Sequence, residues 1–446
     1  MLIRFVVSNF LSFDEEQEFN MIAGNLKGHK EHVYHLPKLD ILKASAIYGA
    51  NGAGKSNLIK AIDFLSNIVK SGRVAHPISE KKFKLNKANR EKPTHFEVEY
   101  YINGKTYAYG VTIGILAEVI EEWLVETRPE KEDKLIFERK LENQKTTINT
   151  AERYRKTERQ KLLIELLEEN LLKANDLLVK EATSVKILEI DLLVEWFNNL
   201  IIMFPSSKFV PLVKHISESS YFKNFCNTVL RGLDTGVQEL DVLHQDFEKI
   251  LNQLPSAKRD EIIGKLSDGK KAMVQLDSAF IMMSKENDDY IAKKLVARHK
   301  DIDGNAVDFD FSEESDGTVR LVDFVPAISN IINHPMVVII DEIDQSLHPA
   351  LLRALVTKVM NDNETEGQFI FTTHESSLLD LDIFRQDEIW FVEKSHVTGS
   401  SQYYSLMTYK PRYDLDIQKG YLKGRFGAIP FLANLNDLNW NEITNA

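Results

Sequence analysis

Eight residues near the start of the chain, Gly49-Ala50-Asn51-Gly52-Ala53-Gly54-Lys55-Ser56, have the types and spacing of a phosphate-binding loop. They fit the pattern G-x-x-x-x-G-K-[ST], in which Lys55 would reach the β- and γ-phosphates and Ser56 would hold Mg²⁺. The glycines let backbone N–H groups approach a polyphosphate closely, and a helix N-terminus adds partial positive charge. The loop and the following Asn57 therefore predict a nucleoside triphosphate site.

The flanking residues supply the elements that such a loop needs. Ala44, Ala46 and Ile47 indicate a short strand before it, and Leu58–Ile62 continue after it as an amphipathic helix. This strand–loop–helix order is the context in which the pattern binds phosphate.

A second candidate region lies far downstream. Met336–Ile340 is a continuous apolar run, typical of a strand buried on both faces of a parallel sheet. It ends in Asp341 and Glu342, at the strand edge where open α/β sheets bind ligands. Asp341 would support Mg²⁺, and Glu342 would polarise the attacking water. The alternative is a strand that ends in solvated acids.

A further apolar strand, Gln368–Phe371, runs into Thr372, Thr373 and His374. His374 can hydrogen-bond a γ-phosphate and report its loss. A structural histidine is the alternative, but its place at a strand end favours the functional interpretation.

These motifs together resemble those of a known group. Asp341-Glu342 followed by Ser346-Leu347-His348-Pro349 and then by Thr372-Thr373-His374 resembles the ABC-type ATPases of the SMC, DNA-repair and OLD group. The resemblance implies that two heads sandwich ATP, so that the chain forms at least a homodimer, and that a signature loop ahead of Asp341 completes the partner's site. Ser315 and Gly317 match the usual Ser-Gly-Gly-Gln, whereas Asp316 and Thr318 depart from it. An ordinary helix cap is the alternative.

Both ends of the chain resemble a narrower set. Ser8–Phe13 contains an Asn-Phe-x-Ser-Phe opening, and residues 421–430 read Tyr-Leu-Lys-Gly-Arg-Phe-Gly-Ala-Ile-Pro. These segments are similar to predicted ATPases of bacterial abortive-infection and anti-phage systems, including the ATPase subunits of PARIS and related ATPase–TOPRIM nuclease pairs. The resemblance implies a slow ATPase that senses infection, with a phage protein as trigger, and controls a toxic nuclease encoded by a neighbouring gene.

Composition bounds the other classes of function. With 446 residues, of which 43% are hydrophobic, the chain can bury a large core. A single cysteine, Cys226, fits a reducing cytosol, and neither a signal peptide nor a membrane-spanning run is expected, so we predict a cytoplasmic protein. The net charge of −12 argues against broad DNA binding. The alternative of a local basic groove that forms on assembly is not excluded by this charge.

The pattern along the chain predicts an α/β fold: a P-loop ABC-type ATPase head with an antiparallel β lobe and a helical insertion. A hairpin is indicated by two alternating segments, Thr94–Ile102 and Lys105–Val111, on either side of the turn Asn103-Gly104. Compact helices are indicated by leucine stripes between about 152 and 266, which are interrupted by Pro205, Pro211 and Pro255. Strands resume at 271–274 and 290–296, with a turn at 303–305. We predict head segments at 1–145 and 269–446 around an insertion at 146–268.

Two other functions stay open: an SMC-like DNA repair or maintenance ATPase, and a nucleotide-bound scaffold with negligible turnover. ATP is favoured over GTP because the chain lacks an Asn-Lys-x-Asp motif. No Cys/His spacing indicates zinc. The residues after His374 leave little room for a TOPRIM domain, so no nuclease is expected in this chain.

Overall fold

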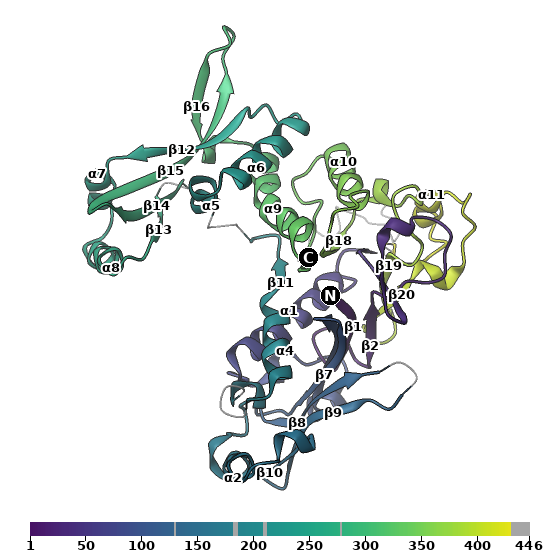
Figure 1. Cartoon of the computed structure of the whole chain (residues 1–446). Helices are drawn as coiled ribbons and strands as arrows, with labels where there is room; N and C mark the ends of the chain where they lie inside the picture. Colours follow the sequence, from purple (N-terminus) through teal and green to yellow (C-terminus); the bar gives the residue numbers. More distant parts are fainter. Residues whose placement is uncertain (129–130, 182–185, 208–211, 277–278, 430–446) are drawn as a thin grey trace, which may run out of the picture. The chain divides into compact units, whose positions relative to one another are not determined.

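The structure is a computed structural model that describes the chain apart from residues 129–130, 182–185, 208–211, 277–278 and 430–446. The chain divides into two compact units (Figure 1). The first unit combines Met1–Phe204, Pro335–Ile343 and Met360–Ala446, and the second combines Pro205–His334 and Asp344–Val359. The three segments predicted from the sequence, 1–145, 146–268 and 269–446, stay a prediction.

The first unit contains a six-stranded sheet that is parallel except at one edge. Its strand order is β11 (Leu200–Met203), β17 (Val337–Ile340), β18 (Gln368–Thr373), β5 (Ala44–Gly49), β19 (Ile389–Lys394) and β20 (Ser401–Ser405). Only β20 runs antiparallel to its neighbour. Every residue of β5, β17 and β18 is buried, which explains the continuous apolar runs in their sequences.

A second sheet in the same unit is antiparallel throughout. Its order is β10 (Lys145–Thr150), β9 (Lys134–Glu142), β8 (Val119–Thr127), β7 (Lys105–Ile113), β6 (Thr94–Ile102), β1 (Leu2–Ser8) and β2 (Gln17–Asn20). The predicted hairpin is confirmed: Asn103 and Gly104 have φ of 48° and 82°, as a two-residue type I′ turn requires. A small hairpin, β3 (Val33–Leu36) and β4 (Leu39–Leu42), leads into β5.

One buried apolar cluster joins the two sheets to the helices of this unit. The cluster includes Phe5 of β1, Ile47 of β5 and Trp196 among its fully or nearly fully buried side chains. The helices that contribute to this cluster are α1 (Lys55–Ser71), α2 (Glu158–Leu166) and α4 (Leu188–Asn198), and α11 (Ile417–Leu422) belongs to the same unit but not to the cluster. The predicted α/β P-loop fold with an antiparallel β lobe is confirmed.

The C-terminal segment that resembles defence ATPases packs against β19. The rings of Tyr421 and Phe426 stack on Phe391, with centroids 5.5 and 5.9 Å away and interplanar angles of 12° and 10°. Gly424 and Gly427 have positive φ, which lets the chain turn tightly between these contacts. Pro430, the last residue of the segment, lies outside the described residues.

The second unit is built on a five-stranded antiparallel sheet. In this sheet β12 (Glu239–Gln245), β15 (Asp289–Lys300), β14 (Ala279–Glu286) and β13 (Ala272–Leu276) are neighbours in that order, and β16 (Ala306–Asp310) also pairs with β15. Its helices are α5 (Leu212–Glu218), α6 (Ser220–Gly232), α7 (Phe247–Asn252), α8 (Ser256–Ser267), α9 (Asp316–Asn333) and most of α10 (Pro349–Met360). The strands and the turn predicted between 271 and 305 are confirmed.

The prediction of helices throughout 152–266 is wrong in two places. Leu200 falls within the region of leucine stripes predicted to be helical, but α4 ends at Asn198 and Leu200 begins β11, which pairs with β17. Short apolar runs fit a buried strand as well as a helix, so pairing decides the outcome. Residues 239–245 also form a strand, β12, because β15 offers a free edge. Pro211 lies outside the described residues.

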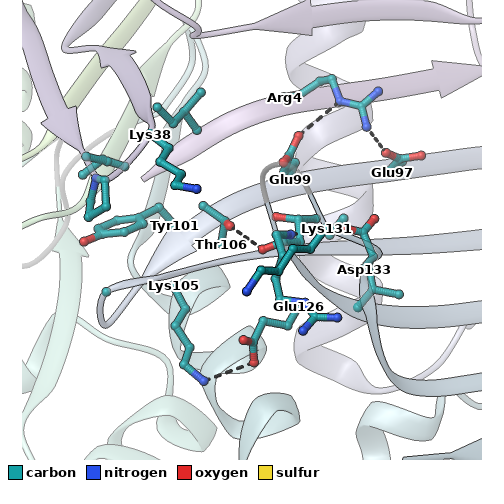
Figure 2. A pocket seen from close by; sticks show the side chains of 18 of the residues that line it. Arg4, Lys38, Glu97, Glu99, Tyr101, Lys105, Thr106, Glu126, Lys131 and Asp133 are labelled. Atoms are coloured by element: carbon teal, nitrogen blue, oxygen red, sulfur yellow. Dashed lines mark hydrogen bonds and ion pairs between the residues drawn. The ribbon is translucent and has the colours of Figure 1, made fainter.

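The antiparallel sheet of the first unit carries a groove of about 750 Å³. Figure 2 shows Arg4 turned toward Glu97 and Glu99, and Lys105 turned toward Glu126. Nε of Arg4 lies 3.4 Å from Glu99, and Nζ of Lys105 lies 3.1 Å from Glu126. Opposite charges therefore neutralise one another along this groove.

Of the helices that the structure describes, none is long and apolar enough to cross a membrane.

The amide of Gln368 connects the two sheets of the first unit. Its Oε1 accepts from the N–H of Leu2, 2.5 Å away, and its Nε2 donates to the carbonyls of Leu2 and Leu42, each 3.0 Å away. All of these atoms are buried. One side chain therefore satisfies three backbone groups from β1 and β4.

We predict that Gln368→Leu lowers the free energy of unfolding by about 2–4 kcal/mol, because three buried backbone groups lose their partner. Denaturant unfolding measures the change. Gln402→Leu, at an exposed position of β20, is the matched control and should stay within about 0.5 kcal/mol of the wild type. Equal stability of the two variants would contradict a connecting role for Gln368.

Candidate nucleotide site

The glycines of the phosphate-binding loop are fixed by backbone geometry and close packing. Gly54 has φ 115° and caps α1, and Gly52 has φ 74°. A Cβ on Gly49 would lie 2.5 Å from the carbonyl oxygen of Val392. A Cβ on Gly54 would meet the hydroxyls of Ser401 and Ser12. The loop therefore excludes side chains at these positions and exposes its backbone at the start of α1.

Residues from both ends of the chain hold this loop in place. Ser401 Oγ donates to the carbonyl of Ala53 at 2.6 Å, and the Tyr403 hydroxyl donates to that of Gly54 at 2.7 Å. The Asn57 amide donates to Ser12 Oγ at 2.8 Å. Burial raises the pKa of Tyr403 well above its usual value, so its hydroxyl stays a donor. Sequence patterns missed Ser401 and Tyr403 because nothing local marks them.

The structure brings the predicted residues Lys55 and His374 together. Nζ of Lys55 donates to the carbonyl of Gly49 at 2.8 Å and lies 2.9 Å from Nε2 of His374. Lys55 is buried, whereas His374, which follows β18, is exposed. A cation and an exposed imidazole thus meet beside the loop.

Ser56 and Asp341, the two residues predicted to hold Mg²⁺, also meet. Ser56 Oγ donates to Asp341 Oδ1 at 3.1 Å, and the Thr372 hydroxyl donates to the same oxygen at 2.7 Å. Asp341 is 2% exposed. A hydroxyl and a carboxylate are oxygen ligands that suit Mg²⁺, so these two residues fit the cation that accompanies a nucleotide. When bound, that cation neutralises charge on the phosphates.

Glu342 adopts a backbone conformation that is uncommon for its residue type. Its φ is 51°, in the left-handed region, and its N–H donates to Thr372 Oγ1 at 2.7 Å. Non-glycine residues hold such conformations at a cost of about 1–3 kcal/mol and cluster at functional sites. Thr372 links the two acids, since it accepts from the Glu342 backbone and donates to Asp341.

Ser315 and Gly317, the candidate signature residues, belong to the second unit. Ser315 caps α9, and its Oγ accepts from the N–H of Thr318 at 3.2 Å. A Cβ on Gly317 would lie 2.8 Å from the carbonyl oxygen of Ser346, so the backbones pack closely there. These contacts fit a helix cap, and the exposed Ser315 is also accessible to a second molecule.

Comparison with solved structures gives three SMC heads. A SmcHead bound to the C-winged helix domain of ScpA is 13% identical, with a TM-score of 0.45, and the match covers 92% of this chain and 99% of the SmcHead chain. The SMC head domain from Thermotoga maritima is 12% identical, with a TM-score of 0.39, and the match covers 91% of this chain and 98% of that domain. The third structure is the Smc head domain with an extended coiled coil, bound to the C-terminal domain of ScpA derived from Pyrococcus furiosus. It is 14% identical, with a TM-score of 0.41, and the match covers 92% of this chain and 97% of that chain. Comparison with curated proteins found no match.

The sequence matches one protein family over residues 44–380, and that family is described as "AAA domain, putative AbiEii toxin, Type IV TA system". The matched segment contains the phosphate-binding loop, Asp341 and Glu342, and His374. Because the match spans most of the chain, this protein belongs to that family of AAA-type ATPases.

Proposed function

We propose that this protein binds ATP with Mg²⁺, hydrolyses it slowly, and uses the cycle to control a toxic effector nuclease in an anti-phage defence complex. The observation that carries the ATPase part is the hydrogen-bonded set of Ser56, Asp341, Thr372 and Glu342 beside Lys55. This set brings two hydroxyls, two acids and a cation together around one loop whose backbone is open to phosphate.

Each residue would take a separate part in hydrolysis. The N–H groups from Gly49 to Asn57 and the ammonium of Lys55 would bind the phosphates. Glu342 would accept a proton from the attacking water, and the bond from Thr372 to its backbone would fix its position. His374 would contact the γ-phosphate, since it lies beside Lys55 at the end of β18.

The defence part rests on the family and on the segments that resemble defence ATPases. The description of the family names a toxin and a type IV TA system. Such a context favours a chain that acts together with a toxic activity, and the net charge of −12 fits a protein partner better than broad DNA binding. We place the nuclease in a neighbouring gene and take a phage protein as the trigger. An SMC-like maintenance ATPase is the alternative.

We also propose that the active form is at least a homodimer. Ser315 is exposed at the N-terminus of an 18-residue helix, which carries partial positive charge and points N–H groups outward. In the dimer, Ser315 and Gly317 of one copy would contact the γ-phosphate bound by the other copy.

The first functional prediction concerns Lys55 and Glu342. Lys55→Ala should abolish most ATP binding, because the phosphates lose their buried cation. Glu342→Gln should keep binding and lose turnover by roughly 10²-fold or more, since the amide cannot accept the proton. Labelled-ATP binding and phosphate release measure both. Lys60→Ala, at an exposed position of the same helix, is the control and should behave as wild type. Wild-type turnover by Glu342→Gln would remove that residue from catalysis.

The second prediction tests the shared site. Neither Lys55→Ala nor Ser315→Arg should hydrolyse ATP alone. A mixture can form one intact composite site in each heterodimer, so part of the activity should return. Phosphate release and the fraction of heterodimers are measured together. Mixed oligomers that form but stay inactive would count against a site shared between copies.

The third prediction tests the effector. The purified protein should leave DNA and RNA intact with Mg²⁺ or Mn²⁺, and expression with its neighbouring gene should restrict phage unless Lys55 is changed to Ala. Plaque counts on a broad phage panel measure restriction. Metal-dependent cleavage by the pure chain would overturn control in trans. Unchanged phage growth together with salt-sensitive DNA binding would favour DNA maintenance.

A further inference from the structure

Three side chains with metal-binding chemistry gather on the short turn before β3. His29, Glu31 and His32 place one ligand atom each within 4.8 Å of the others. Nδ1 of His29 lies 3.3 Å from Glu31 Oε1, and Nε2 of His32 lies 3.8 Å from the same oxygen. The two imidazole rings stack with centroids 4.7 Å apart. Three donors therefore converge on one point.

The orientation of His32 supplies an independent sign of a ligand. Its side chain is fully buried, and Nδ1 lies 3.1 Å from both carboxylate oxygens of Glu388. Its other nitrogen, Nε2, is buried and has no hydrogen-bond partner among the described residues. A buried polar atom without a partner costs free energy, so its persistence calls for an explanation. This atom faces Glu31.

In each ring, the nitrogen that points away from Glu31 faces a hydrogen-bond acceptor. Nε2 of His29 lies 2.9 Å from the carbonyl oxygen of Leu381, and Nδ1 of His32 faces Glu388. Each acceptor favours a proton on the nitrogen that it faces. With a cation between the rings and Glu31 in place of the contact from His29 Nδ1 to Glu31, the lone pairs of neutral rings would be on His29 Nδ1 and His32 Nε2, the two atoms that converge on Glu31. Zinc-bound histidines in proteins are fixed by carboxylates and carbonyls in this way.

We propose that His29, Glu31 and His32 form a Zn²⁺ site with one position open to solvent. Two histidines and a glutamate are an established ligand set for zinc, whose bonds of 2.0–2.1 Å place tetrahedral ligands about 3.3 Å apart. The observed separations need to shorten by about 1.5 Å at most. Glu31 would bring negative charge to the cation, and the nearby cation Arg385 is paired with Asp387 at 2.8 Å.

The site would join two segments that are distant in sequence. Glu388 directly precedes β19, and its carbonyl accepts from the N–H of Ala46 and the hydroxyl of Ser45 near the start of β5. The phosphate-binding loop follows the other end of β5. Zinc would therefore stabilise the amino edge of the parallel sheet without contacting the nucleotide.

The three ligands lie within four residues, a spacing that zinc-motif patterns do not include. The sequence analysis, which found no Cys/His spacing that indicates zinc, would for this reason not detect the site.

The test uses the full chain without an affinity tag, purified without chelators and assayed without nucleotide. After addition of one equivalent of Zn²⁺ and dialysis, elemental analysis should find one zinc ion in each chain. Removal by EDTA should lower the melting temperature, and Zn²⁺ but not excess Mg²⁺ should restore it. Co²⁺ should give the visible spectrum of a tetrahedral site with nitrogen and oxygen ligands.

Variants separate the site from general stability. Glu31→Gln, at an exposed position, and His32→Asn should abolish stoichiometric zinc binding, and Glu388→Gln should weaken zinc binding roughly 10–100-fold. His35→Asn, an exposed histidine near the cluster, is the control and should bind as wild type. ATP binding by Glu31→Gln reports that the chain is folded. Absence of zinc from the wild type, or unchanged zinc in folded Glu31→Gln, would overturn the proposal.

Discussion

The candidate nucleotide site depends on one carboxylate oxygen. Oδ1 of Asp341 accepts hydrogen bonds from Ser56 and from Thr372, and in this way connects the end of β17 to α1 and to β18. Because Asp341 is almost completely buried, its negative charge is costly unless donors or a cation compensate it. The two hydroxyls compensate part of this cost, and the cation that accompanies a nucleotide would compensate the rest. The same oxygen therefore favours the folded arrangement and would also favour the bound state.

The local parts of this site could be predicted from the sequence. The glycine spacing around Lys55, the apolar run before Asp341 and the strand before His374 each belong to one short segment. Their chemistry follows from residue type and from position at a strand end. That Lys55 meets His374 and that Ser56 meets Asp341 then follows from the order of parallel strands, in which β17, β18 and β5 are neighbours.

The remaining contacts could not be predicted because they join residues far apart in the chain. Thr372 is followed by a second threonine, Thr373, and the sequence does not show which of the two links Asp341 and Glu342; the fold assigns this contact to Thr372. Gln368 looks like a polar start to a strand, yet it is fully buried between two sheets. In the same way, Leu200 extends a helical stripe until β17 pairs with its strand. In each case a tertiary partner outweighs the local pattern.

The path of the chain suggests how a second molecule could influence Glu342, the proposed catalytic residue. Strand β17 belongs to the first unit, but the residues directly before Pro335 and after Ile343 belong to the second. Glu342 therefore lies one residue from the point where the chain enters the second unit. The candidate signature residue Ser315 caps α9, which ends at Asn333, and only three residues separate Asn333 from the start of β17. A partner that binds at Ser315 and moves the second unit would act on β17 through two covalent links. Among the residues that the first unit contributes to the candidate site, Glu342, with its uncommon φ, lies nearest in the chain to these links.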